Sequence, residues 1–567
     1  MVSEKIWFKS YDKHVPKTLQ YPTDDLGTLM TKAMEKYKDR IGIYFYDSEI
    51  LFKDVLDKSR RFATFLQKNG LKKGDVVAMN LPNSPQYIFA LYGTYIAGGT
   101  STGLSPLLSP AEYIYQLNDC KAKFVVTLDI IHEKIFSKIV EKLPDLQVLV
   151  PTNISDLMGF PKFKVVLGKM LKKIPKGKMI PYPGKKVVPF MEAIQTEIDL
   201  KPVKLDAKKD LALIQYTGGT TGSPKGTEIT HSNLVSNIHQ FDVWIDREHG
   251  KEVNMTAFPY FHIAGLFIAL FLTHIGATHI IIANPRETDH MINEIIERKP
   301  TSFGNVPTLF LLLQRNPKVK TIPPETLEHI SLWVSGAAPF PTEAIRGFEK
   351  DFHTENKFVE VYGMTESAVL ATVNPAHGVK KIGTVGLPLP DTDVKLVDLE
   401  SGKEVETGKP GEILLKGPQI TKSYYNKPDA TAKTYVDGWL HTGDVGVFDD
   451  DGYLKIVDRV KDMLVVSGFK VYSVHVEDIM TKHPDIQLMA IIGLPDKDRP
   501  GSEIVKAMIQ LKPGIEPTEE VKENIKKFAE QNLAKYEVPK VWDFVKELPT
   551  TAVGKVLKRA LREEKKP

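Results

Sequence analysis

The sequence of 567 residues contains a single cysteine, Cys120. An intramolecular disulfide is therefore excluded, and so is any zinc site built on paired cysteines. Because disulfides are rare in reducing compartments, a cytoplasmic protein is the expectation. The first seven residues carry charges where a secretory signal peptide needs an apolar run, so no leader is predicted.

Long apolar runs are also scarce. The range 265–283 approaches the length of a membrane span, but it contains two histidines, two threonines and a central glycine. A buried helix followed by a buried strand is predicted there instead.

Neither sign of charge dominates the chain. Lys and Arg number 75 against 71 Asp and Glu, which gives a formal net charge of +4. Such a balance gives no argument for a nucleic-acid partner. Hydrophobic residues make up 42% and charged residues 26%, a composition typical of globular proteins. At this length two or more domains are expected.

Helical and strand patterns alternate through most of the sequence. Leu26 to Tyr37 and Phe52 to Asn69 have helical spacing, whereas Asp75 to Asn80, Ala122 to Thr127 and Ser331 to Ser335 read as short apolar strands. This alternation predicts an α/β fold with stacked, mostly parallel sheets covered by helices.

The pattern changes twice toward the C-terminus. From Val385 onward short strands and turns predominate, which predicts a small β-rich subdomain. After Lys461 a helix–strand alternation resumes on a smaller scale. We predict a large N-terminal domain at 1–460 and a small α+β C-terminal domain at 461–567.

A loop rich in glycine and threonine, Tyr216 to Gly226, follows the predicted strand Leu211 to Gln215. Glycines let successive backbone N–H groups face an anion, hydroxyls add donors, and Lys225 adds a cation. A Walker A loop is excluded because Lys225 stands between a proline and a glycine rather than opening a helix. The alternative interpretation is a flexible surface loop that binds no ligand. The candidate phosphate-binding positions are Thr217, Gly218, Gly219, Thr220, Thr221, Gly222 and Lys225.

This loop resembles the signature of the adenylate-forming enzymes, which include acyl-CoA synthetases, luciferases and peptide-synthetase adenylation domains. Further blocks match that superfamily in its order and extend the resemblance over nearly the whole chain. They are Pro259 to Gly265, Ser335 to Pro339, Tyr362 to Ser367, Gly438 to Asp444, Asp458 to Asp462, and Leu548 to Lys555.

The resemblance implies a site in which a carboxylate attacks the α-phosphate of ATP. It implies that Tyr362 stacks on adenine, that Thr365 binds the α-phosphate, and that Glu366 holds Mg²⁺, with Thr217 as a weaker candidate ligand. Taken singly, each of these residues has an ordinary structural explanation; the ordered set carries the prediction.

Further roles follow from the same resemblance. Asp444 is implied to accept the ribose hydroxyls, with Arg459 as a second ribose contact. Lys555 is implied to bridge the carboxylate and the α-phosphate, and His262 joins the catalytic set. The remaining nucleotide-binding positions implied are Gly336, Ala337, Ala338, Glu360 and Gly363.

Adenylation and thiol attack need different surroundings, and the superfamily solves this by rotating its small domain. The resemblance places the hinge at Lys461. Rotation exchanges the Lys555 loop for Gly468, Phe469 and Lys470, which are implied to border the CoA tunnel. Ser473, where the superfamily usually has proline, is expected to cap the following helix.

The acid is inferred by analogy with the superfamily's acyl pocket. The stretches at 304–309, 336–340 and 364–370 are small and apolar, with no Arg or Lys to pair a second carboxylate. An aliphatic monocarboxylic acid of medium or long chain is favoured. A short or hydroxylated acid stays open, as does an acyl-AMP ligase that feeds a carrier protein.

A lysine-rich segment raises the question whether the protein contacts a membrane surface. The range 162–186 carries nine lysines and no acid, and its apolar residues from Phe163 to Ile174 follow a helical stripe. Two interpretations stay open: residues 162–178 rest on an anionic membrane surface, or the stripe faces the core while the lysines reach solvent. The expected co-substrates are ATP and CoA with Mg²⁺, and the expected state is a monomer or a homodimer.

Overall fold

The computed structural model describes residues 5–217, 224–467, 469–496, 499, 502–550 and 556–563. Within these residues no helix has both the length and the apolar character needed to cross a bilayer. The apolar range 265–283 instead holds the buried helix α10 and the buried strand β11, as predicted.

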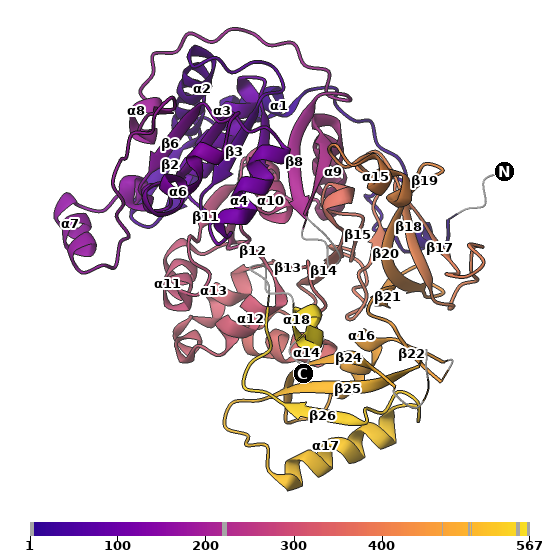
Figure 1. Ribbon diagram of the computed structural model, residues 1–567. Helices are drawn as coiled ribbons and strands as arrows, with labels where there is room; N and C mark the ends of the chain where they lie inside the picture. Colours follow the sequence, from indigo (N-terminus) through magenta and orange to yellow (C-terminus); the bar gives the residue numbers. More distant parts are fainter. Residues whose placement is uncertain are drawn as a thin grey trace.

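Two large sheets form the N-terminal body (Figure 1). The first has the strand order β7-β6-β5-β3-β4-β8-β9 and is parallel except for the β8–β9 pair. Its strands are β3 (Val76–Asn80), β4 (Thr100–Gly103), β5 (Phe124–Leu128), β6 (Val148–Thr152), β7 (Lys186–Val187), β8 (Leu211–Thr217) and β9 (Lys225–Thr230).

The second sheet has the order β16-β15-β14-β13-β12-β10-β11-β1-β2 and is parallel from β14 to β1. Its strands are β1 (Ile41–Phe45), β2 (Ser48–Leu51), β10 (Val253–Thr256), β11 (Thr278–Ile281), β12 (Ser302–Asn305), β13 (Leu332–Ser335), β14 (Phe358–Tyr362), β15 (Thr372–Val373) and β16 (Leu387–Pro388). The predicted α/β class with mostly parallel sheets is confirmed.

Helices cover both sheets, and the largest hydrophobic core joins them. Apolar side chains of α1, α3, α9 and α10 meet in it. The helices of the body are α1 (Leu26–Lys36), α2 (Phe52–Lys68), α3 (Pro85–Ile96), α4 (Pro110–Asp119), α5 (Asp129–Ile131), α6 (Ser137–Ile139), α7 (Lys162–Met170), α8 (Phe190–Ala193), α9 (His231–Ile245), α10 (Ile263–His274), α11 (Thr288–Arg298), α12 (Pro307–Gln314), α13 (Pro324–His329), α14 (Thr342–Phe352) and α15 (Pro428–Thr434).

A smaller antiparallel sheet completes the body and agrees with the predicted β-rich subdomain. It consists of β17 (Asp393–Val397), β18 (Gly411–Lys416), β19 (Tyr435–Val436), β20 (Trp439–Phe448) and β21 (Leu454–Arg459). The N-terminal arm, residues 5–22, begins against it: Trp7 in the short helix η1 (Ile6–Ser10) stacks on Phe448 at 5.6 Å between ring centroids.

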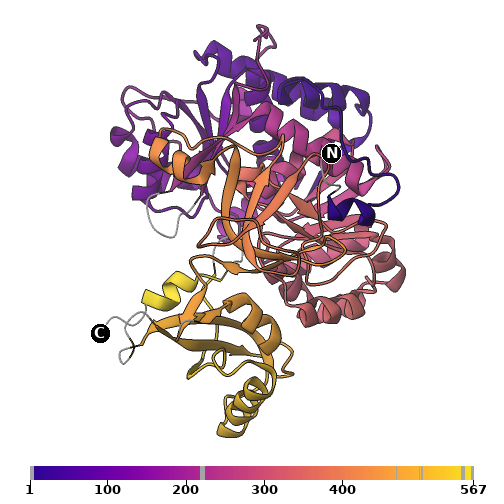
Figure 2. The same cartoon turned by 90° about the vertical axis from the view of Figure 1, so that its right-hand side faces the viewer.

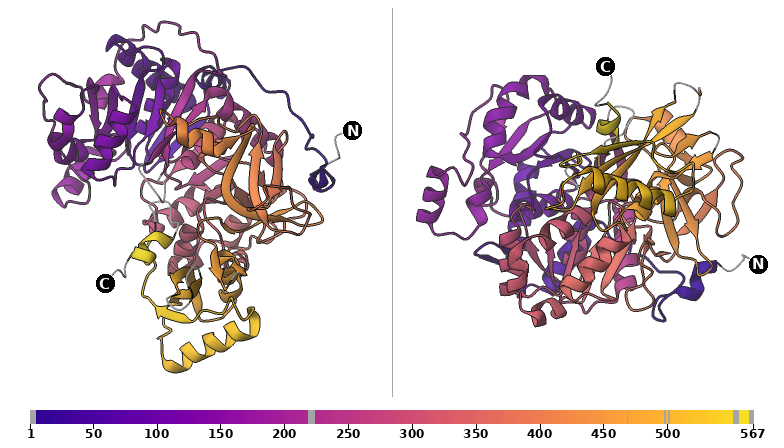
Figure 3. Two further views of the ribbon diagram at one scale, coloured as in Figure 1. Left: turned by 45° about the vertical axis from the view of Figure 1, so that its right-hand side comes forward. Right: turned by 90° about the horizontal axis from the view of Figure 1, so that it is seen from below.

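The C-terminal residues form a separate layer of strands and helices below the body (Figures 1 and 2). They have their own buried core, around Val476, Ile491 and Ile525. The helix α17 lies on the outer side of this layer, away from the body (Figure 3). The elements are β22 (Leu464–Val466), β23 (Phe469–Val471), α16 (Ser473–Met480), β24 (Ile486–Pro495), β25 (Glu503–Leu511), α17 (Glu519–Asn532), β26 (Val541–Phe544) and α18 (Lys558–Glu563).

One expectation for α16 is wrong. The residue before this helix is Tyr472, and Ser473 is its first helical residue. The Ser473 hydroxyl donates instead to Asp458 at 2.9 Å. The side chain is therefore used to join the C-terminal layer to β21 rather than to cap its own helix.

The exposure of the helix α7 bears on the two interpretations of the lysine-rich segment. It has no buried residue, and Phe163, Val166 and Met170 are 70%, 56% and 75% exposed. In Figure 1 it projects from the side of the body. Ile174, the last residue of the stripe, lies beyond α7 and is partly buried against the main core. The stripe therefore faces the core only at its end, and its helical part is exposed.

Candidate active site

The predicted site residues gather where neighbouring parallel strands end. In the nine-stranded sheet β10, β12, β13 and β14 lie side by side, with Thr256 opposite Gly304, Asn305 opposite Ser335, and Ser335 opposite Glu360. The loops that follow these strands carry His262, Gly336 to Ala338, and Gly363 to Glu366. Ligands of open α/β sheets bind at this edge because the loops there converge.

Tyr362, Asp444 and Arg459 form one cluster. The Tyr362 hydroxyl donates to Asp444 Oδ2 at 2.9 Å, and Arg459 Nε donates to Oδ1 of the same carboxylate at 2.7 Å. Asp444 and Arg459 are cross-strand neighbours on β20 and β21, whereas Tyr362 ends β14. The β-rich sheet thus brings an ion pair to the strand ends of the nine-stranded sheet.

The charge states of this cluster are set by burial and by Asp444. Burial, reinforced by the negative charge of Asp444, raises the pKa of Tyr362 well above its usual value, so its hydroxyl stays a donor. Burial lowers the pKa of Arg459, but the charge and hydrogen bond of Asp444, together with Tyr362 and Asp462, outweigh it, and the net shift is upward. Asp444 itself is only 6% exposed. The cluster presents a fixed anion and a fixed cation.

A second cluster centres on Tyr424, a residue that the sequence analysis missed. Its hydroxyl donates to Glu366 Oε1 at 2.7 Å, and Lys225 Nζ lies 5.0 Å from the centre of its ring. Two predicted residues, Lys225 and Glu366, are therefore brought together by one tyrosine. Tyr424 stands in no recognised block, so the sequence offered no signal for it.

The neighbourhood of Tyr424 also fixes the end of the phosphate loop. Thr227 and Tyr424 form a β-bridge, and Gly226 accepts a backbone hydrogen bond from Tyr425 at 2.7 Å. Thr217, on the other side of the hairpin, donates from Oγ1 to the carbonyl of Lys225 at 3.5 Å. Gly218, Gly219, Thr220, Thr221 and Gly222 lie outside the described residues.

Backbone strain is concentrated in the turn that carries Thr365 and Glu366. Gly363 is required there, because a Cβ at this position would lie 1.6 Å from the carbonyl oxygen of Val369. Val369 itself has φ 117° and Ala368 has φ 47°, regions that side chains disfavour. Such strain persists only where the surroundings enforce it, and it is common at functional sites.

The backbone of the turn after β13 is also strained. Ala337 has φ 68°, and a Cβ on Gly336 would lie 2.6 Å from Val361 Cγ2. The backbone of this predicted nucleotide-binding segment therefore passes close to β14.

Glu360 is a half-buried carboxyl next to this turn. Its Oε2 accepts a hydrogen bond from the Gly383 N–H at 2.8 Å. Burial nevertheless raises the pKa of Glu360 to about 8, with Asp478 and Glu349 adding to the shift. The group is therefore a neutral acid at pH 7 in the absence of ligand.

Two buried polar atoms at these strand ends lack a protein partner within the described part of the chain. They are Asn305 Nδ2 and Ser335 Oγ, on residues that face each other across β12 and β13. Buried polar groups are nearly always paired, so such atoms indicate a place for water or ligand.

The remaining predicted residues are more dispersed. His262 precedes α10, and its Nδ1 accepts from the Ala264 N–H at 3.3 Å. Phe469 is 57% exposed and stacks on Tyr536 at 4.8 Å between ring centroids, and Lys470 pairs with Glu400 at 3.1 Å. Gly468 and Lys555 lie outside the described residues.

Comparison with known proteins assigns the chain to a family. The model of the AMP-binding enzymes matches residues 30–425, and the model of the AMP-binding enzyme C-terminal domain matches residues 475–555. The chain belongs to the AMP-binding enzyme family. The predicted superfamily is thereby confirmed.

Individual relatives of this AMP-binding enzyme match it from end to end. It is 36% identical to the long-chain-fatty-acid–CoA ligase of Bacillus subtilis, over 100% of this chain and 99% of the relative. It is 35% identical to the enzyme of the same name from Escherichia coli O6:H1, over 99% and 98%. It is 31% identical to 4-coumarate–CoA ligase 1 of Solanum tuberosum, over 97% and 95%.

Solved structures with the same fold include the anthranilate CoA ligase AuaEII in complex with anthranoyl-AMP. It has a TM-score of 0.83 and 25% identity, over 95% of this chain and 97% of that one. ATP-bound MatB from Rhodopseudomonas palustris has a TM-score of 0.78 and 27% identity, over 95% and 99%.

Proposed function

We propose that this AMP-binding enzyme is an ATP-dependent ligase that activates a long-chain fatty acid as acyl-AMP and transfers the acyl group to CoA. The observation that carries the proposal is its end-to-end similarity to the long-chain-fatty-acid–CoA ligases of Bacillus subtilis and Escherichia coli. The clusters at the strand ends support it, because they supply the groups that the first half-reaction needs.

In this proposal Tyr362, Asp444 and Arg459 hold the nucleoside. The Asp444 carboxylate is preorganised by two donors and accepts the ribose hydroxyls, while the Tyr362 ring borders adenine. Thr365, Lys225 and Lys555 then face the phosphates. Fixed donors and cations stabilise the charge that develops on phosphoryl oxygens without reorganisation during the reaction.

Glu366 fits a magnesium ion. Oε1 of its buried carboxylate accepts a hydrogen bond from Tyr424, and we assign Oε2 to the cation, with Thr217 as a second candidate ligand. Mg²⁺ prefers oxygen ligands and commonly takes one or two carboxylates together with substrate phosphates. When bound, the ion would offset the negative charge of the pyrophosphate leaving group.

The proposed hinge lies at Lys461, at the boundary of the two proposed domains (1–460 and 461–567). Polar contacts cross it, among them Asp458 with Ser473, Thr342 with Asp478 at 3.3 Å, and Lys455 with Asp478 at 3.6 Å. Polar interfaces of this kind exchange more easily than apolar ones, which suits a rotation between the two half-reactions.

We further propose that α7 docks on an anionic membrane surface. Its exposed apolar residues would enter the headgroup region while its lysines meet acidic lipids. A long-chain acid partitions into the membrane, so this contact would place the enzyme at its substrate.

The proposed function is tested by incubating the purified protein with ATP, Mg²⁺, CoA and acids from C2 to C18. We expect AMP, pyrophosphate and acyl-CoA, with the highest kcat/KM at C12 or longer. Accumulation of acyl-AMP without thioester would instead assign an acyl-AMP ligase for a carrier protein, and a preference below C8 would overturn the long-chain assignment.

A further inference from the structure

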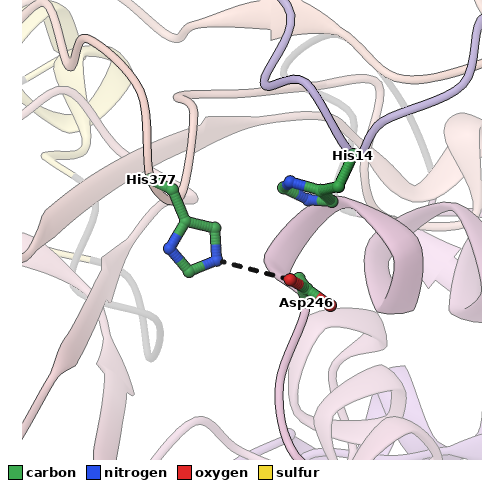
Figure 4. Close-up of side chains that lie close together, drawn as sticks. All are labelled: His14, Asp246 and His377. Carbon is green, nitrogen blue, oxygen red and sulfur yellow. Dashed lines mark ion pairs between the residues drawn. The ribbon is translucent and has the colours of Figure 1, made fainter.

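Three exposed side chains from distant parts of the sequence point toward one another (Figure 4), and none of them belongs to the site described above. They are His14 of the N-terminal arm, Asp246 at the end of α9, and His377 in the loop after β15. One ligand atom from each lies within 4.8 Å of the others. All three residues are exposed.

We propose that His14, Asp246 and His377 bind a divalent transition-metal ion, with zinc as the ion of choice, and that the ion fastens the N-terminal arm to the body. Two imidazoles and one carboxylate are ligands that zinc takes readily. Magnesium and calcium prefer all-oxygen sites, so the ligand set discriminates against both.

The backbones that carry these ligands are held in place by buried contacts close by. The Trp244 indole, two residues before Asp246, donates from Nε1 to the carbonyl of Asn374 at 3.0 Å. Tyr11, three residues before His14, packs edge-on against the same indole at 5.1 Å between ring centroids. One buried tryptophan thus joins all three segments.

A second contact links the two histidine segments directly. The His377 N–H donates to Asp12 Oδ2 at 3.0 Å. The segments approach closely here, since a Cβ at position 378 would lie 2.2 Å from Asp12 Oδ1 and would displace that side chain. The backbones of the two histidine segments are therefore held together, and the imidazole ring centroids lie 5.4 Å apart.

Asp246 is also fixed by its backbone. It ends α9 in the left-handed conformation, with φ 46°, and its N–H donates to the carbonyl of Asp242 at 3.1 Å. Its Oδ2 lies 4.0 Å from His377 Nε2. The fixed turn therefore holds the Asp246 carboxylate on the side of the two histidines (Figure 4).

Closing the site around zinc needs only side-chain motion. A tetrahedral zinc ion holds its ligand atoms roughly 3.3 Å apart, so the three atoms must move together by about 1.5 Å at most. Rotation of exposed side chains between neighbouring rotamers covers such a distance. Water would complete the coordination.

The test measures zinc on tag-free, chelator-treated protein by titration and by metal analysis after desalting. We expect about one zinc per chain for the wild type. His14→Ala, His377→Ala and Asp246→Asn should each raise the zinc concentration for half-saturation on the order of tenfold or more. Asparagine tolerates the left-handed conformation, so Asp246→Asn removes the charge and keeps the turn.

His329→Ala, which removes an exposed histidine at the end of α13, is the matched control and should bind zinc like the wild type. Trypsin cleavage at Lys13 and Lys17 reports on the arm: zinc should slow it in the wild type and not in His14→Ala. Equal zinc binding by the wild type and a His14→Ala/His377→Ala variant would overturn the site, and zinc-independent cleavage would overturn the fastening of the arm.

Discussion

The hydroxyl of Tyr424 donates a hydrogen bond to Oε1 of Glu366 at 2.7 Å, across 58 residues of sequence. Glu366 is 7% exposed, and Thr421 donates from its N–H and its hydroxyl to the Glu366 carbonyl at 2.9 and 3.0 Å. The segment at 421–424 therefore holds the proposed metal ligand from both its backbone and its side chain. It makes Tyr424 a positioning residue for Glu366.

Tyr424→Phe should raise the KM for Mg²⁺-ATP about tenfold or more, because a hydrogen bond to a charged group contributes about 1.5–3 kcal/mol. Steady-state kinetics with varied Mg²⁺ would measure it, with the shift largest at low Mg²⁺. Tyr425→Phe removes the neighbouring hydroxyl and serves as the control. Equal KM values for the two variants would contradict the role of Tyr424 in positioning Glu366.

Glu360 gives a pH-dependent contribution to stability. Its pKa rises from 4.5 to about 8 on folding, because burial disfavours the charged form. Between pH 4.5 and about 8 the Glu360 carboxyl is ionised in the unfolded chain but protonated in the folded chain. The free energy of unfolding therefore falls as the pH rises through this range. The slope is at most about 1.4 kcal/mol per pH unit.

Glu360→Gln should flatten this dependence, since the amide cannot ionise. Thermal unfolding midpoints at pH 5.5 and 8.5 would be compared, and the wild type should lose more stability than the variant between them. Glu343→Gln, an exposed substitution on α14, should behave like the wild type. An equal loss of stability between the two pH values in the wild type and in Glu360→Gln would contradict the raised pKa of Glu360.

A double substitution, Phe163→Ser with Met170→Ser, should weaken binding to vesicles of phosphatidylglycerol and phosphatidylcholine by about tenfold or more. Each side chain contributes about 1.5–3 kcal/mol when it leaves water. Co-sedimentation would measure the binding, which should also fall with added salt because the lysines contribute. Leu107→Ser is the control, since Leu107 is 81% exposed but lies outside the segment. Unchanged binding by the double variant would rule α7 out as the contact.

Lys461→Pro should slow thioester formation far more than adenylation, because proline fixes the backbone φ at the proposed hinge. Lys461→Ala removes the same charge without that restriction and should affect both steps little. Lys555→Ala should show the opposite selectivity, with adenylation lost and acyl transfer from supplied acyl-AMP retained. Rapid-quench assays of each half-reaction separate the two, and equal loss of both steps in Lys461→Pro would contradict a hinge there.

The sequence by itself determined the fold class and the family, and it predicted several residues that the structure brings together at the strand ends. The alternation of helical and apolar strand patterns is local, since it follows from periods of 3.6 and 2 residues, and the resulting parallel sheets place successive loops at one edge. The blocks that carry Tyr362, Glu366 and Asp444 are likewise contiguous in the sequence. Such features need no knowledge of which segments meet.

Only the tertiary structure decided the contacts between distant segments. Tyr424 reaches Glu366 because Thr227 of β9 forms a β-bridge with Tyr424. The apolar residues on α7 stay exposed because no element covers them within the described residues. The side chain of Ser473 likewise bonds to Asp458 of β21, a partner from another element, instead of capping its own helix. Pairings across hundreds of residues depend on the packing of whole sheets, and no local pattern records them.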